Sequence, residues 1–144
     1  MRTALFSILI AIPLFLGASL ASASDPVGRW KTIDDDTGNA KSIVEISRAA
    51  DGSLSGTVVE VLQSDSGPNP VCDKCSGDRK DQPIEGMTIL WGLVPKDDDW
   101  AGGTILDPAN GRSYRARMKM HSEDRLGVSG CLVFICREQV WHRE

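Results

Sequence analysis

The chain has 144 residues, of which 41% are hydrophobic and 25% are charged, and its formal net charge is -4. This is the composition of a globular protein, and it excludes a wholly disordered chain. The length suits one domain, and the acidic balance argues against a nucleic-acid binder, whose surface is usually basic.

Residues 1–23 have the pattern of a secretory signal peptide. Arg2 provides the positive start, an apolar run covers residues 4–16, and Ala21-Ser22-Ala23 is a cleavage site of small residues. The apolar run is shorter than the roughly 20 residues that a transmembrane helix needs, and no later stretch could span a bilayer. We therefore expect cleavage near Ala23 and a periplasmic or secreted protein without a transmembrane segment, with one domain over residues 24–144.

The first half of this domain shows strand patterns separated by turns, and no convincing helix. A turn cluster follows the first strand, and Asp51-Gly52 is a hairpin signal. The apolar pattern changes phase between Val58 and Val59, which indicates a β-bulge. The predicted strands are 28–33, 42–48 and 54–62.

Residues 63–85 form the longest predicted loop. Glycine, proline and charged residues interrupt every periodic pattern in this segment. Loops of this length are usually functional or tied down, and Cys72 and Cys75 could tie this one down.

Strand patterns resume at residue 87. Met87, Ile89, Trp91 and Leu93 alternate along one predicted face, an acidic loop is expected over residues 95–100, and 104–106 is a short strand. A strong turn signal covers residues 107–111.

Residues 112–120 show the clearest alternation in the chain. Apolar residues occupy every second position, and Arg115, Arg117 and Lys119 lie between them. A period of two is typical of a strand with one face in the core and the other in water. A polar turn over 121–125 and strands over 126–130 and 134–142 complete the pattern.

About eight antiparallel strands result from this assignment. Closing the sheet into a barrel removes its exposed edges, and an eight-stranded barrel can hold side chains or one small ligand. Strand propensity alone leaves a sandwich open as the alternative.

The ends of the domain suggest how such a barrel would close. Gly28-Arg29-Trp30 opens the first strand, as Gly-x-Trp does in lipocalin-like barrels, and Trp141-His142-Arg143 ends the last. In those barrels a tryptophan from the first strand packs under an arginine from the last, where the guanidinium can stack on the indole. Trp30 and Arg143 are the residues expected in these structural roles.

Longer stretches of the domain match a known family: 28–34, 41–44, the Cys72-Asp73-Lys74-Cys75 loop, 83–87, 103–114 and 139–143. In these stretches the chain resembles the DUF2147 family of secreted bacterial proteins of unknown function. The resemblance implies an all-β fold, a single small antiparallel eight-stranded lipocalin-like barrel, and no assigned activity. One departure is Ser129, which precedes Gly130 where the family often has arginine.

Four cysteines in an exported chain indicate disulfides, because that compartment oxidises thiols. The local pairing Cys72–Cys75 with Cys131–Cys136 is expected, with a bulge or kink over residues 132–135 to bring the second pair together. Pairing the long loop to the last strands remains open. A redox C-x-x-C would need a helix that the sequence does not predict, and the spacing does not suit a zinc ribbon.

No catalytic constellation is found, and no cofactor or metal is expected. His121 falls in a predicted surface turn and His142 lies beside Arg143, so neither has an obvious partner. The acidic runs at residues 34–36 and 97–99 lack EF-hand spacing and are interpreted as solvated turns.

Two functional hypotheses follow. The first is a carrier of a small hydrophobic or amphipathic molecule inside the barrel, where Met and aromatic side chains suit an adaptable pocket. The second is an envelope structural or protein-interaction module that acts through the disulfide-bearing loop 63–85 without a small ligand. The residues expected to line the pocket are Trp91, Tyr114, Met118 and Met120.

Overall fold

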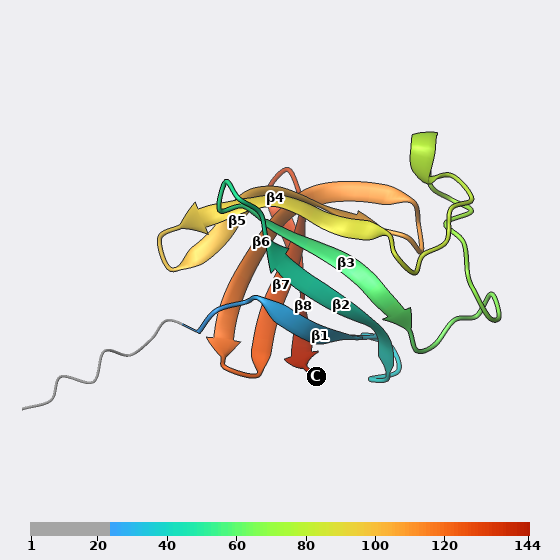
Figure 1. Cartoon of the computed structure of the whole chain (residues 1–144), viewed down its shortest axis with the longest axis horizontal. Helices are drawn as coiled ribbons and strands as arrows, with labels where there is room; N and C mark the ends of the chain where they lie inside the picture. Colours follow the sequence, from blue (N-terminus) through green and yellow to red (C-terminus); the bar gives the residue numbers. More distant parts are fainter. Residues whose placement is uncertain (1–23) are drawn as a thin grey trace, which may run out of the picture.

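A computed structural model describes residues 24–144 (Figure 1), and the expected signal peptide lies outside the described residues. No helix in this part of the chain is long and apolar enough to cross a membrane. The elements in chain order are β1 (Gly28–Ile33), β2 (Ala40–Arg48), β3 (Leu54–Val61), the short 3-10 helix η1 (Gly77–Arg79), β4 (Thr88–Lys96), β5 (Asp99–Asp107), β6 (Arg112–Ser122), β7 (Arg125–Leu132) and β8 (Ile135–Arg143).

The eight strands form a closed antiparallel barrel. Each strand pairs with the next, and β8 returns to pair with β1, so both edges of the sheet are hydrogen-bonded. The predicted fold class is confirmed, and the sandwich alternative is wrong. The closing seam is short, since the register pairs only Trp30 with Arg143 and Lys31 with His142.

The strand order places the connections at two ends of the barrel. We call one of them the closed end: it holds the start of β1, the end of β8 and the turns β2–β3, β4–β5 and β6–β7. The open end holds the other four connections, among them the long β3–β4 loop, which extends away from the strands at the right of Figure 1.

Large apolar side chains fill the interior of the barrel. A methyl group added at Gly56 would lie 3.1 Å from Val44 Cγ1 and 3.2 Å from Leu90 Cβ, so even this glycine faces packed neighbours. An eight-stranded barrel is just wide enough for such a packed core. Fully buried side chains include Trp30, Val44, Ile46, Leu54, Leu90, Leu93, Met118 and Leu126.

The bulge expected at Val59 is present: Val44 pairs with Val58 and Ile43 with Glu60, which leaves Val59 without a partner. The acidic loop expected over residues 95–100 is wrong. Pro95 pairs with Trp100 there, so β4 and β5 form a tight hairpin.

The predicted inward face of β4 is partly wrong. Gly92 adopts a φ of 72°, in the left-handed region that glycine tolerates, and the β3–β4 register shifts between Leu90 and Leu93. The irregularity puts Leu90 and Leu93 both in the core, fully buried, whereas Trp91 remains half-buried. Strict alternation along β4 predicts the same burial for Trp91 as for Leu93, and this prediction is wrong.

Candidate functional site

The closed end is built around one tryptophan and one arginine. The guanidinium carbon of Arg143 lies 4.1 Å from the centre of the Trp30 ring. Its nitrogens donate to the carbonyls of Glu123 (2.6 Å), Val27 (3.2 Å) and Asp25 (3.0 Å). Stacking and three charge-assisted hydrogen bonds hold three chain segments together at this end, and the Trp30 indole is fully buried beneath them.

The four predicted pocket residues do not gather in one place. Met118 is buried in the core, and Tyr114 accepts a hydrogen bond from Asn110 at 3.0 Å near the start of β6. Met120 lies six positions further along the same strand, about 20 Å away at the usual rise. The ring of Trp91 packs under Arg79 of the long loop, 4.5 Å from its guanidinium carbon.

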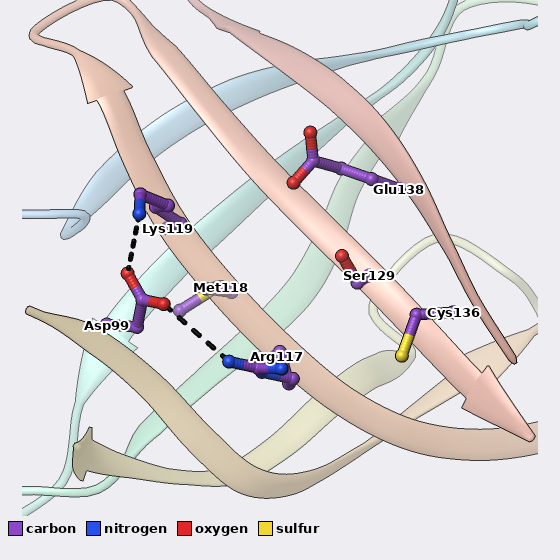
Figure 2. Close-up of a pocket in the computed structure, with 7 residues that line it drawn as sticks. All are labelled: Asp99, Arg117, Met118, Lys119, Ser129, Cys136 and Glu138. Carbon is purple, nitrogen blue, oxygen red and sulfur yellow. Dashed lines mark ion pairs between the residues drawn. The ribbon is translucent and has the colours of Figure 1, made fainter. Parts of the chain in front are cut away.

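A pocket of about 200 Å³ lies on the wall formed by β5 to β8 (Figure 2). Asp99 faces Arg117 at 3.8 Å and Lys119 at 3.7 Å, while Ser129 and Glu138 line the opposite side. Two cations and two carboxylates share the pocket, so their charges compensate one another. Its volume is also below the roughly 300 Å³ typical of ligand sites.

A histidine–carboxylate pair crosses the same wall. His121 Nε2 lies 3.0 Å from Glu138 Oε1, and a Cβ on Gly127 between them would approach both side chains to 2.5 Å. The turn predicted for His121 from the sequence is wrong, because this residue belongs to β6. Only the register of β6, β7 and β8 reveals this pair, because 17 residues separate its members.

The long loop between β3 and β4 is a defined structure. Its two arms form a bridge between Val71 and Pro83, and Cys72 N donates to Gln82 O at 2.8 Å. The Cys72–Cys75 disulfide is buried. Lys74 Nζ donates to Ala109 O at 3.0 Å, which attaches the loop to the β5–β6 turn.

The junction of this loop with β4 contains the larger hollow, of about 340 Å³, which we call the loop hollow. Arg79 stacks on Trp91 beside it, and no carboxylate in residues 24–144 forms an ion pair with this arginine. The Glu85 carboxylate also lines the hollow, and one of its oxygens accepts a hydrogen bond from Val61 N at 2.8 Å. The lining residues are Arg79, Gln82, Pro83, Glu85, Gly86, Met87 and Thr88.

The second disulfide joins Cys131 to Cys136 across the β7–β8 hairpin. The two cysteines are directly paired in the register, and Leu132 pairs with Ile135 next to them. The expected kink within one strand is therefore wrong: the cysteines lie on adjacent strands, and a two-residue turn brings them together.

The first acidic run forms a hydrogen-bonded turn. Asp34 accepts bonds from the backbone nitrogen of Thr37 at 2.8 Å and from its hydroxyl at 2.9 Å. These bonds, with a smaller contribution from Lys41, lower the pKa of Asp34 to about 2. Within residues 24–144 no three His, Cys, Asp or Glu side chains come together as metal ligands.

Comparisons with known proteins agree with this architecture. A search of curated proteins found no match. Among solved structures, the chain is similar to protein HP1028 from Helicobacter pylori, described as belonging to the lipocalin family. The TM-score is 0.71 at 15% identity, over 83% of each chain, which establishes a shared fold. A family model of uncharacterized proteins conserved in bacteria, DUF2147, matches residues 28–143, and the chain therefore belongs to that family.

Proposed function

We propose that this protein is an exported lipocalin-like binder of a small amphipathic molecule, and that the ligand occupies the loop hollow rather than the barrel interior. The observation that carries the proposal is a hollow of about 340 Å³ beside a stacked arginine without a carboxylate partner in the described residues. That volume is within the range of about 300–1,000 Å³ typical of small-molecule sites.

The packed interior supports this placement. The sequence predicts a ligand among Trp91, Tyr114, Met118 and Met120, whereas the barrel interior holds a continuous cluster of buried apolar side chains and these four residues lie at different places on the barrel. The long loop, in contrast, is a surface element held on a rigid barrel, which is where binding residues usually occur.

The lining of the hollow suggests the chemical class of the ligand. Met87 and Pro83 offer apolar surface, and Arg79 offers a planar cation whose position is held by Trp91. A guanidinium can bind a carboxylate or phosphate with two parallel hydrogen bonds. An apolar body with an anionic head is therefore the class that these groups suit. The two disulfides fit export to an oxidising compartment.

Calorimetric titration with dodecanoate and with the uncharged dodecanol tests the proposal. We expect saturable dodecanoate binding that Arg79→Gln weakens about tenfold or more, the effect of losing a charge-assisted pair, while dodecanol binding changes little. Lys80→Gln, one residue away, is the matched control and should bind both probes as the parent does. Equal losses in the two variants, or dodecanoate binding that only Tyr114→Ala removes, would contradict the loop hollow as the site.

A protein partner for the loop is the second candidate. The bridge between Val71 and Pro83 gives the loop a fixed shape, Val71 is exposed within it, and Leu62 is an exposed apolar side chain directly after β3. If this candidate is correct, Val71→Ser weakens binding of a protein partner and leaves dodecanoate titrations unchanged.

A further inference from the structure

The β7–β8 turn exposes four consecutive apolar residues, which we call the apolar tip (residues 132–135). Their exposed fractions are 58% for Leu132, 70% for Val133, 95% for Phe134 and 79% for Ile135. Single exposed apolar side chains are ordinary on protein surfaces, whereas a contiguous group usually marks an interaction site. The tip belongs to the open end of the barrel, away from the packed closed end.

The tip is held in a fixed conformation. Directly behind it, the Cys131–Cys136 disulfide joins its two strands, and Cys136 lies at one edge of the wall pocket in Figure 2. Val133 adopts a φ of 52°, which is unfavourable for a β-branched residue and is normally left to glycine or asparagine in such turns. Backbone strain of this kind persists where the surrounding structure enforces it, and it is common at functional sites.

The charges around the tip are mainly positive. Residues 125–137 contain no Asp or Glu. Arg115 is paired with Cys131 in the register, Arg112 lies three residues closer to the open end on the same strand, and Arg137 follows Cys136. Asp35 is the one carboxylate that contacts this group among the described residues, at 3.1 Å from Arg137. Three arginines therefore lie on the strands next to the apolar tip, with Asp35 in contact with Arg137 and Asp107 opposite Arg112 in the register.

We propose that the apolar tip docks the protein on an anionic lipid bilayer, with Phe134 and Ile135 inserted among the headgroups and acyl chains and with Arg112 and Arg115 on the lipid phosphates. The charge complementarity selects this occupant, because apolar side chains combined with flanking arginines are the features that bind an anionic interface. A narrow convex turn also suits insertion between lipids. The proposal goes beyond the small-molecule site and does not depend on it.

Co-sedimentation with vesicles tests the docking. The whole exported protein, with disulfides intact, is mixed with vesicles of phosphatidylcholine alone or of phosphatidylcholine containing phosphatidylglycerol. We expect stronger sedimentation with the anionic vesicles, and a loss of about tenfold or more in affinity for Phe134→Ser, because a large inserted side chain is removed. Arg112→Gln together with Arg115→Gln should reduce the preference for phosphatidylglycerol.

Two controls keep the result specific. Leu62→Ser removes an exposed apolar side chain elsewhere at the open end and should sediment with vesicles as the parent does. Arg79→Gln should also sediment as the parent does, which separates membrane docking from the proposed ligand site. Thermal unfolding confirms that Phe134→Ser is folded. The proposal is overturned by absence of vesicle binding, by equal binding of parent and Phe134→Ser, or by a self-associated protein that Phe134→Ser converts to monomer, since the tip would then contact a second copy.

Discussion

Arg143 shows how one side chain can close a barrel. Its planar guanidinium covers the Trp30 ring and donates to carbonyls from the N-terminal segment and from the β6–β7 turn. Lysine could supply the charge at this position but not the stacking or the fork of donors. The residue therefore links the segment before β1 to the β6–β7 turn, which do not pair directly with each other.

Removal of this side chain should reduce the stability of the whole barrel. We expect Arg143→Ala to lower the free energy of unfolding by about 2 kcal/mol, from the lost stacking and the carbonyls left without donors. Arg29→Ala is the control, because Arg29 is half-exposed and pairs with Glu144 at 2.6 Å, and it should lower stability by less than about 1 kcal/mol. Urea unfolding measures both, and equal effects would contradict the special role of Arg143.

Asp34 should titrate far below an ordinary aspartate. Hydrogen bonds from the Thr37 backbone and hydroxyl favour the charged carboxylate and lower its pKa to about 2. A lowered pKa means that ionised Asp34 stabilises the folded state above about pH 4, the ordinary range of the unfolded residue, and that this contribution disappears as the pH falls towards 2.

NMR titration of the Asp34 carboxyl carbon tests this assignment. In Thr37→Ala we expect the pKa of Asp34 to rise, although it stays below the ordinary value because the backbone donor and Lys41 remain. Thr57→Ala, which removes a hydroxyl on β3, should leave the Asp34 titration unchanged. An unaltered midpoint in Thr37→Ala would show that the hydroxyl does not contribute.

Element geometry explains why β5 is hard to predict from sequence. Gly102 and Gly103 lower its strand propensity, and three acidic residues precede Trp100, so the segment looks like a loop. The barrel, however, needs a glycine there. A Cβ on Gly103 would lie 2.5 Å from the carbonyl oxygen of Trp91 and 2.8 Å from the nitrogen of Leu93. The close approach of the β4 and β5 backbones therefore requires glycine at position 103, although glycine has a low strand propensity.

Two interior glycines should respond differently to an added methyl group. At Gly103 two of the three nearest atoms are backbone and the third is Leu93 Cγ at 2.7 Å, so we expect Gly103→Ala to destabilise the barrel by about 2 kcal/mol or more. At Gly130 the nearest atoms are side-chain carbons, Tyr114 Cβ at 3.3 Å and Ile105 Cγ2 at 3.5 Å. An alanine at position 130 reduces the conformational entropy of the unfolded chain, which offsets the mild crowding in the folded state. The free energy of unfolding of Gly130→Ala should therefore be within about 1 kcal/mol of the parent value. Thermal unfolding ranks the two, and the reverse order would refute the packing argument.

At the scale of the whole molecule, the disulfides act locally and the barrel holds itself together. The two bonds close short segments, with sequence separations of 3 and 5. Neither bond joins distant parts of the chain. The closed hydrogen-bonded sheet and the continuous apolar core provide the long-range connections instead.

Reduction should therefore weaken the protein without unfolding it. Loop-closure entropy predicts about 2 kcal/mol for each bond, so we expect urea unfolding with reductant to shift to lower urea while circular dichroism before the transition retains its β signal. Before reduction, the denatured mass should be four hydrogens below the full-thiol mass. Loss of the β signal on reduction would show that the disulfides hold the barrel.

The sequence by itself determined the strand-rich class and the positions of most strands. These features follow from local signals: alternation along residues 112–120 and turn residues between strands. Family resemblance added the barrel architecture and the closing roles of Trp30 and Arg143, and the even number of cysteines indicated disulfides. Each of these signals is contained in a few neighbouring residues or in the composition.

Only the tertiary structure decided which side chains meet. Trp91 lies under Arg79, strand register brings His121 to Glu138, and the apolar core combines side chains from several strands. Such contacts depend on barrel register and on the volumes of side chains from several strands at once. No short stretch of sequence contains that information, because a shift of one residue in register moves every side chain to the other face.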